Sequence, residues 1–444
     1  MRQAIRITHP VVAWLPLICF YWYLLTGFWG IDGHRTAFSV LVIYFLYWAW
    51  LNWKILRSSS LFWIALCLSV YTAIRTGAGY AQDPETFALQ MKFGQGLVGM
   101  GGFFAIFLIP WVIGPQKESR YDRAFPVLLL SLLIQVFLEL TVHPDGVSLA
   151  QIPSGRPNFQ MGPNSFGFIC GMLLVGMVSL SWRYLKKYSS FRSTSRVMIN
   201  IILLFSTFAG LGFGVLVTQS RSSWLATSVT LVFVIGSILR KYASNKSFFP
   251  TKRLIGILVL ISLIFGTLIF SHWQLISNRI TAETHIVQDI FEKDIYDLSK
   301  NSITRRLKMW KASFETIQQN FVFGISPGQV YNMLDSHLSI SRHYYQSHNL
   351  FLEVFVSLGA VGFILFVTML LIAIREIRRS RKKGTIPYEW SLCCSAMLMV
   401  VIIEGMFDFL MSDSESVFVY TFLLAMVMAL QIENNRGMDK ANAT

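Results

Sequence analysis

Long apolar runs separated by polar connectors extend over almost the whole chain. A helix needs about 20 apolar residues to cross the hydrocarbon core of a bilayer. Twelve runs of roughly that length lie at residues 11–30, 36–53, 60–76, 93–113, 124–142, 165–182, 197–217, 223–239, 254–272, 349–374, 389–410 and 416–432. The pattern therefore predicts about twelve transmembrane helices.

The composition supports the same fold class. Of the 444 residues, 54% are hydrophobic and only 14% are charged, whereas soluble domains carry about 25% charged residues. We therefore expect an all-α polytopic membrane protein. No stretch has the composition of a separate soluble domain, so residues 1–444 are interpreted as a single transmembrane domain. The five cysteines all fall inside apolar runs, which argues against a disulfide framework or a cysteine-based metal site.

Basic residues indicate the orientation of the helices, because Lys and Arg are retained on the cytoplasmic side. With the N-terminus inside, the cytoplasmic connectors hold most of the 38 basic residues, including six between Arg375 and Lys383. Both termini are therefore expected to be cytoplasmic. The net charge of +15 is then mostly a topology signal. We expect no nucleic-acid partner, because the basic residues are scattered among short connectors.

Residues 273–348, between the ninth and tenth runs, form a connector much longer than the usual one. In its second half one apolar stripe of a helix recurs every three or four positions, at Ile303, Leu307, Trp310, Phe314 and Ile317. The other faces of this helix are basic, so we expect it on the mouth of the bundle or in the membrane interface, in contact with membrane lipid. Residues 273–348 are interpreted as a partly helical external loop subdomain.

Arg221 stands alone between two apolar runs at the predicted outer membrane boundary, flanked by Ser and Thr. An ionisable residue at this depth is by default a functional hypothesis, and snorkelling of its side chain to the headgroups is the alternative. Glu404 and Asp408 lie four residues apart near the outer end of the eleventh run, hence on one helical face. They are expected to pair with Arg221 or to orient a neighbour, and a structural ion pair is an equally good interpretation.

The external segment Asp145 to Asn164 is rich in Gly and Pro, which favours an irregular re-entrant or surface segment that helps to wall a site. The alternative is an ordinary loop in which Asn164 caps the next helix. Further along the chain, His348 stands at the start of the apolar run 349–374. A titratable imidazole costs free energy at the edge of a membrane helix, which favours a functional role for His348. The alternative is that His348 is a structural residue at the helix start, beside the cap candidates Ser347 and Asn349.

Several motifs resemble those of the O-antigen ligase and polymerase family. They are Ser220-Arg221, Arg306-Leu-Lys-Met-Trp310 followed by Phe323-Gly-Ile-Ser-Pro-Gly328, and His348-Asn-Leu-Phe-Leu-Glu353 with Gly359, while Gly155-Arg156 to Pro163-Asn164 is similar to a further motif. The resemblance covers roughly residues 150–370, and the first 140 residues match only as a run of membrane helices. One departure is Ser326-Pro327-Gly328, which stands where the family more commonly has a plain Gly-x-Gly.

The resemblance implies a metal-independent, inverting glycosyltransferase of the GT-C type. It would transfer a glycan from undecaprenyl diphosphate to a sugar of the lipid A core, in lipopolysaccharide biosynthesis, at the periplasmic face of the bacterial inner membrane. It implies that His348 is catalytic and that Arg221 and Arg306 bind substrate, Arg306 being preferred to Arg305 by the Arg-Leu-x-x-Trp spacing. Arg156 and Asn349 are further substrate-binding candidates from the same motifs.

The physical chemistry agrees with these roles. A neutral imidazole can accept the proton of a sugar hydroxyl as it attacks. The positive end of a helix dipole and nearby arginines would keep that imidazole neutral. Guanidinium groups bind phosphate oxygens bidentately and remain charged at any working pH. The external loops hold no DxD pair and no histidine cluster with metal-ligand spacing, so we expect neither a metal nor another cofactor.

Two other functions stay open. Polymerisation of a repeat unit would use the same donor and chemistry and would differ only in its acceptor. A secondary transporter also suits twelve helices with buried charges, although its site would lie near the bilayer midplane between related halves. The candidate residues instead gather at the predicted outer face.

Overall fold

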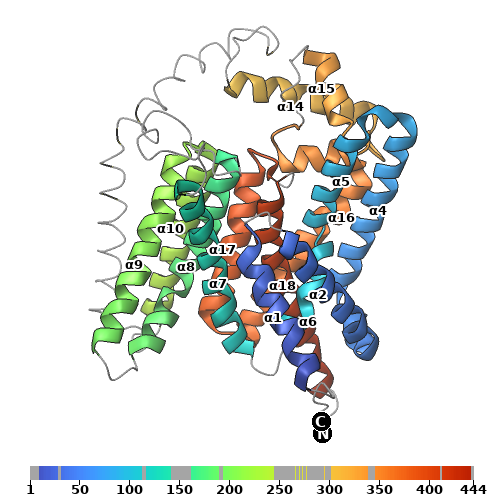
Figure 1. The fold of residues 1–444 in the computed structure, drawn as a ribbon. Helices are drawn as coiled ribbons and strands as arrows, with labels where there is room; N and C mark the ends of the chain where they lie inside the picture. Colours follow the sequence, from blue (N-terminus) through green and yellow to red (C-terminus); the bar gives the residue numbers. More distant parts are fainter. Residues whose placement is uncertain are drawn as a thin grey trace.

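The protein folds into a bundle of long helices, which Figure 1 shows in the computed structural model. The structure describes residues 10–28, 32–112, 117–141, 162–189, 194–244, 302–338, 346–410 and 413–441, together with the single positions 266, 270, 273, 277 and 295. The named elements in these residues are all helical, as the sequence predicted. They are α1 (Pro10–Thr26), α2 (Asp32–Leu51), α3 (Trp53–Leu56), α4 (Ser60–Gln82), the 3₁₀ helix η1 (Pro84–Thr86), α5 (Phe87–Met100), α6 (Phe103–Val112), α7 (Lys117–Thr141), α8 (Pro163–Ser189), α9 (Thr194–Val217), α10 (Arg221–Ser244), α14 (Ser302–Gln319), α15 (Val330–Leu338), α16 (Leu350–Lys383), α17 (Tyr388–Gly405) and α18 (Ser414–Ala441).

Six helices in the described part of the chain are long and apolar enough to cross a membrane. Their spans are Ser60–Gln82, Pro163–Ser181, Arg221–Lys241, Leu350–Lys383, Tyr388–Gly405 and Ser414–Asn435. The pair α5 and α6, bent by 46°, adds a seventh if it is one broken span. The predicted run 254–272 lies almost wholly outside the described residues. The polytopic membrane class is therefore supported, and the count of twelve stays a prediction.

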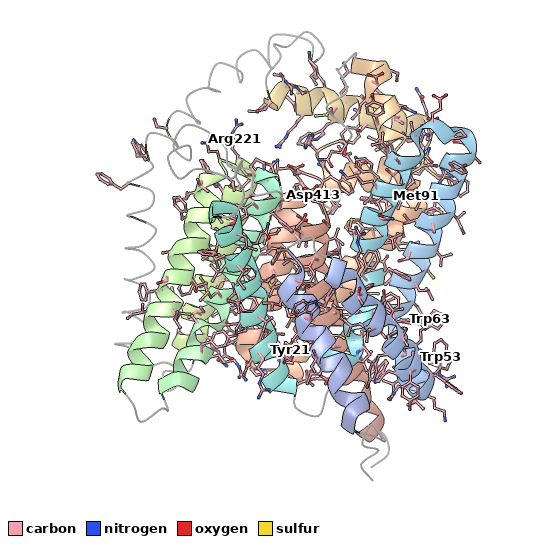
Figure 2. The ribbon with its side chains drawn as sticks, in the orientation of Figure 1. Tyr21, Trp53, Trp63, Met91, Arg221 and Asp413 are labelled. Atoms are coloured by element: carbon pink, nitrogen blue, oxygen red, sulfur yellow. The ribbon has the colours of Figure 1, made fainter. Side chains whose placement is uncertain are left out.

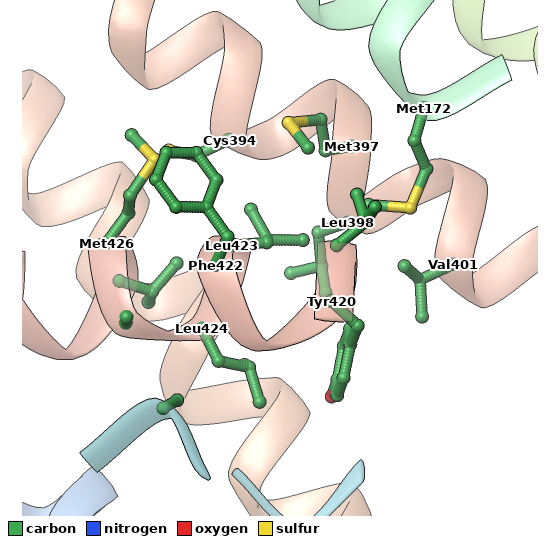
Figure 3. Packing of buried hydrophobic residues seen from close by; sticks show 14 of the residues in the cluster. Met172, Cys394, Met397, Leu398, Val401, Tyr420, Phe422, Leu423, Leu424 and Met426 are labelled. Atoms are coloured by element: carbon green, nitrogen blue, oxygen red, sulfur yellow. The ribbon is translucent and has the colours of Figure 1, made fainter. Parts of the chain in front are cut away.

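The centre of the bundle is formed by α8, α17 and α18. Their spans are 94%, 72% and 89% buried within the protein, against 39% for α4 and α10. Figure 3 shows this packing, in which Met172 of α8 and Leu398 of α17 belong to the same apolar cluster as Leu423 of α18. Around the outside, large apolar side chains such as Trp50 (81% exposed) and Val232 (72% exposed) face outward. Such a surface is typical of helices that face lipid.

The two ends of the bundle differ. In Figure 1, α14 and α15 lie across one end, while the first turn of α1 and the last turn of α18 lie at the opposite end. The first turn of α1 and the last turn of α18 thus lie at the same end of the bundle, which agrees with the prediction that both termini lie on one side of the membrane. The assignment of that end to the cytoplasm stays a prediction.

A break in α16 fixes the position of α14. At Gly359 the φ of 66° and the ψ of −169° are not helical. A backbone group freed by this break is satisfied from the segment after α14, because Ala360 N donates to Phe321 O at 2.8 Å. A Cβ on Gly359 would lie 2.3 Å from the carbonyl oxygen of Val322, so the close approach of the two backbones requires glycine. Residues 321–326 are thereby anchored to α16.

The departure from Gly-x-Gly at residues 326–328 is accommodated by the left-handed region of the backbone. Ser326 has a φ of 87° and Gly328 a φ of 82°. For a residue with a Cβ this conformation costs roughly 1–2 kcal/mol. Ser326 is fully buried and its N–H donates to Ser357 O at 3.0 Å. These contacts hold serine in a conformation that glycine would adopt freely.

The predicted helix in the long connector is present as α14, but its protein-facing side differs from the predicted stripe. Within the stripe Ile317 is buried, whereas Phe314 is 56% exposed. The buried face carries mostly small and polar residues, namely Thr304, Met309, Ala312, Ser313, Thr316 and Ile317. Small side chains allow α14 to lie close to the first turns of α16. Packing against this neighbouring helix therefore decides which face of α14 is buried. The first half of the connector lies outside the described residues.

Candidate functional site

His348 is held in an unusual backbone conformation just before α16. Its φ is 50°, a region in which few residues other than glycine are found. The next residue, Asn349, is the N-cap, and its Oδ1 accepts from the N–H groups of Phe351 and Leu352, at 3.0 Å each. The Nδ2 of Asn349 donates to the carbonyl oxygen of Met406 at 2.8 Å. The predicted helix start is confirmed, and Asn349 joins it to the segment that follows α17.

A buried carboxylate supports the residue before the histidine. Both the N–H and the Oγ of Ser347 lie 2.8 Å from Oε2 of Glu353, which is fully buried. The carbonyl oxygen of Ser347 accepts from Trp310 Nε1 of α14 at 3.1 Å. These bonds tie the loop before His348 to α16 on one side and to α14 on the other. The backbone that carries the imidazole is therefore fixed from two directions.

Asp408 is the centre of the site. Its Oδ1 lies 2.8 Å from Nδ1 of His348 and accepts from Phe409 N at 2.9 Å. Its Oδ2 accepts from Asn164 Nδ2 and lies 3.7 Å from Nη2 of Arg306. Burial alone would raise the pKa of Asp408, but the nearby charge and hydrogen bond of His348, together with Arg306, lower the pKa to about 2. Asp408 is therefore an ionised carboxylate at neutral pH.

This ionisation state assigns the tautomer of His348. An ionised carboxylate can only accept hydrogen bonds, so Nδ1 carries the hydrogen that points to Asp408. In the neutral ring the lone pair then belongs to Nε2. The His348 side chain is 17% exposed, so it is partly accessible from outside the bundle. The arrangement can accept a proton at Nε2 and stabilise the resulting imidazolium through Asp408.

The structure brings Arg306 rather than Arg305 into contact with Asp408. The side chain of Arg306 is 29% exposed, so its guanidinium both touches Asp408 and reaches solvent. The preference for Arg306 as a substrate-binding residue stays a prediction. Arg305 is half-buried on the same helix.

Arg221 is the first residue of α10. The two residues after it are anchored to α17, because Ser222 Oγ and Ser223 Oγ donate to Oε1 of Glu404 at 2.7 and 3.0 Å. Glu404 lies one helical turn before Asp408. Figure 2 shows Arg221 and Asp413 at the same end of the bundle. Glu404 therefore accepts hydrogen bonds from two hydroxyl groups, and Asp408 contacts His348 and Arg306. The functional role of these two acidic residues stays a prediction.

Asn164 contributes to the site in a way that the sequence did not predict. It is the second residue of α8, and its side chain donates to Asp408 rather than capping its own helix. Its neighbour Ser165 donates to Asp413. Its position at the end of the Gly/Pro-rich segment was the only sequence signal. Arg156, from the same segment, lies outside the described residues.

No cluster of three or more His, Cys, Asp or Glu side chains that could hold a metal ion is found among the residues that the structure describes. Metal independence stays a prediction.

Comparison with known proteins bears on the same region of the chain. Residues 206–367 match the model of a family described as O-antigen ligase. The matched stretch includes Arg221, Arg306 and His348, and it confirms the resemblance that the sequence motifs indicated. Among curated proteins, none matches the chain.

Proposed function

Residues 206–367 match the model of a family described as O-antigen ligase, and from this premise we propose a specific reaction. The family supports a glycan-transferring enzyme of the ligase or polymerase type in general. We propose that this enzyme is an O-antigen ligase of the GT-C type, which transfers a glycan from undecaprenyl diphosphate to a sugar hydroxyl of the lipid A core. Its site would face the periplasm, and both termini would lie in the cytoplasm.

The observation that carries the proposal is the pair formed by His348 and Asp408, with Arg306 on the second oxygen of the same carboxylate. A sugar hydroxyl is a poor nucleophile, and Nε2 of His348 accepts its proton as the oxygen attacks the anomeric carbon of the donor. The bond from that carbon to the diphosphate oxygen breaks in the same step. Undecaprenyl diphosphate leaves with the electron pair, and a single direct displacement of this kind inverts the anomeric centre.

The imidazolium that forms is stabilised by Asp408, which is already ionised and already oriented. Because Phe409 N and Asn164 also donate to this carboxylate, it does not need to reorganise as positive charge develops on the ring. Preorganised electrostatic groups of this kind supply a large part of enzymatic rate enhancement. Asp408 orients and stabilises His348, while His348 moves the proton.

The leaving diphosphate gains negative charge as the glycosidic bond breaks, and guanidinium groups are suited to it. Arg306 is partly exposed beside the base, and Arg221 begins the neighbouring α10. The first turn of α10 adds the positive end of a helix dipole. These groups would do the electrostatic work that a metal ion does in other glycosyltransferases.

The position of the cluster also separates this proposal from transport. His348 precedes the first residue of α16 and Asp408 follows the last residue of α17. Both therefore lie at the ends of candidate membrane spans, whereas the binding sites of secondary transporters lie near the bilayer midplane. The geometry favours an enzyme that works at the membrane surface.

The test uses purified protein in detergent with an undecaprenyl diphosphate-linked glycan, a lipid A core acceptor and EDTA. We expect the wild type to place glycan on lipid A core, and His348→Ala to form no product. Elongation of the donor's own glycan would identify a polymerase instead. A loss of activity in EDTA that a divalent ion restores would refute the metal-free mechanism. If the wild type forms neither product, and the same protein reconstituted into liposomes takes up a solute under a gradient, the enzyme proposal is wrong.

A further inference from the structure

A cavity lies among α1, α2, α5, α6 and α18. Its volume is about 390 Å³, near the lower end of the range for small-molecule sites, roughly 300–1,000 Å³. Aromatic rings and two cationic side chains line it, and none of the described lining residues is acidic. The lining residues that the argument uses are Tyr23, Phe38, Phe418, Arg35, Lys92 and Thr421. The wall therefore combines apolar ring faces with two positive charges.

A buried hydroxyl in the wall points to a ligand independently of the cations. Thr421 is 1% exposed, and its Oγ1 has no hydrogen-bond partner among the described residues. A buried polar group left in this state costs about 1–3 kcal/mol. An oxygen atom of a bound molecule would satisfy it. Arg35 and Lys92 are exposed lining residues, whereas Thr421 in the same lining is buried, so the cavity offers both exposed and buried polar groups.

The cavity adjoins the His348 site through the segment that follows α17. Phe93, the neighbour of Lys92, stacks on Phe409 with ring centroids 6.1 Å apart, and Phe409 directly follows Asp408. At the other end of this segment, Ser414 lines the cavity. The cavity is built from different helices than those that carry Arg221 and Arg306. Two cationic regions, formed by separate elements, therefore flank one proton-accepting centre.

We propose that this cavity binds the phosphate-bearing sugar of the acceptor lipid, while the donor diphosphate binds at Arg221 and Arg306. The inference rests on the proposed function, because transfer requires both substrates beside the base at once. Lys and Arg bind phosphate oxygens, and the ring faces cover the apolar side of a sugar. A volume of about 390 Å³ accommodates a headgroup unit rather than a whole glycolipid. The acceptor class is then a phosphorylated glycolipid, and an uncharged acceptor would bind weakly.

A binding measurement tests the cavity without depending on transfer. The protein is placed in phosphatidylcholine nanodiscs, and the probes are monophosphoryl lipid A and its dephosphorylated form. We expect the wild type to bind the phosphorylated probe at least tenfold more tightly, and a variant that combines Arg35→Gln with Lys92→Gln to lose this preference. Lys382→Gln removes one exposed charge from the far end of α16 and should keep it. An unchanged preference in the double variant would overturn the proposal.

The orphan hydroxyl has its own matched pair of variants. Thr421→Val keeps the shape of the side chain and removes the hydroxyl, and we expect it to weaken binding of both probes two- to fivefold. Thr227→Val is the control, because Thr227 Oγ1 of α10 is also buried without a hydrogen-bond partner in the described part of the chain but does not line the cavity. Equal effects of the two substitutions would count against a ligand at Thr421. Displacement of the glycolipid by phosphatidylglycerol at equal affinity would show a general anionic-lipid site and overturn the assignment.

Transfer kinetics then identify which substrate carries the phosphate. In the Arg35→Gln and Lys92→Gln double variant we expect the acceptor KM to rise at least tenfold, with the donor KM and kcat within twofold of wild type. A rise in the donor KM instead would assign the cavity to the donor and overturn the acceptor proposal. If the wild type shows no transfer, the proposed function fails, and the binding measurement still decides whether the cavity recognises a phosphorylated sugar lipid.

Discussion

Replacement of Asp408 by asparagine tests the electrostatic core of the proposed mechanism. The substitution keeps the size of the side chain and removes the charge that lies 2.8 Å from Nδ1 of His348. At an effective dielectric constant of about 20, two unit charges at that distance interact by about 6 kcal/mol. If the ring carries about half a charge in the transition state, the loss is about 3 kcal/mol, or on the order of a hundredfold in kcat.

The assay is steady-state glycan transfer at saturating donor and acceptor. We expect kcat to fall on the order of a hundredfold, while the acceptor KM changes little, because Asp408 contacts His348 and the proposed donor-binding residue Arg306 rather than the acceptor. Asp413→Asn is the matched control, since Asp413 lies in the same segment and accepts a hydrogen bond from Ser165. A kcat for Asp408→Asn within threefold of the control would refute the role of the pair.

Three further outcomes follow from the structure. Arg306→Lys keeps the charge beside Asp408 but removes the guanidinium fork that would bind two phosphate oxygens. The activation free energy should rise by about 2 kcal/mol, so kcat/KM should fall roughly thirtyfold, whereas Lys308→Gln should change kcat/KM little. Gly359→Ala would place a Cβ 2.3 Å from Val322 O at a φ of 66°, so we expect a loss of folded protein on size-exclusion chromatography. Gly77→Ala should be tolerated, because a Cβ added there meets no neighbouring atom within 4 Å. Because the pKa of Asp408 lies below its ordinary value of 3.8, at about 2, its ionised form stabilises the fold above pH 4, and this stabilisation is lost as the pH falls towards 2. Wild type should therefore resist thermal inactivation better than Asp408→Asn at pH 7, because the pKa shift corresponds to about 2 kcal/mol of folding free energy. This difference should shrink at pH 2.5. A difference that stays constant between the two pH values would contradict the assignment.

Local signals in the sequence indicated the start of α16 but left two cap candidates, Ser347 and Asn349. Asn349 is a good N-cap because its short side chain can accept hydrogen bonds from the next turn, and an apolar run follows directly. The structure has the same cap. The preference for Arg306 over Arg305 came from the family resemblance. The structure places Arg306 beside Asp408, and its binding of substrate stays a prediction.

The face of α14 could not be predicted in the same way. An apolar stripe indicates which side avoids water, but lipid and protein are both apolar surroundings, so the stripe does not identify the side that packs on the bundle. Phe314 is 56% exposed while Ala312 is fully buried. Close contact with α16 favours small side chains, and only the position of the neighbouring helix reveals this.

The sequence by itself determined the helical membrane class and indicated where α16 begins, because both depend on hydrophobicity and capping within one segment. The resemblance to a family supplied His348, Arg221 and Arg306 as candidates, and their roles stay predictions. Only the tertiary structure decided the partners. Asn164, Arg306, His348 and Asp408 come from four separate parts of the chain and meet at one carboxylate. The residues that line the cavity, among them Lys92 and Thr421, also come from separate parts of the chain. Contacts of this kind depend on how helices pack, and no local pattern along the chain records that arrangement.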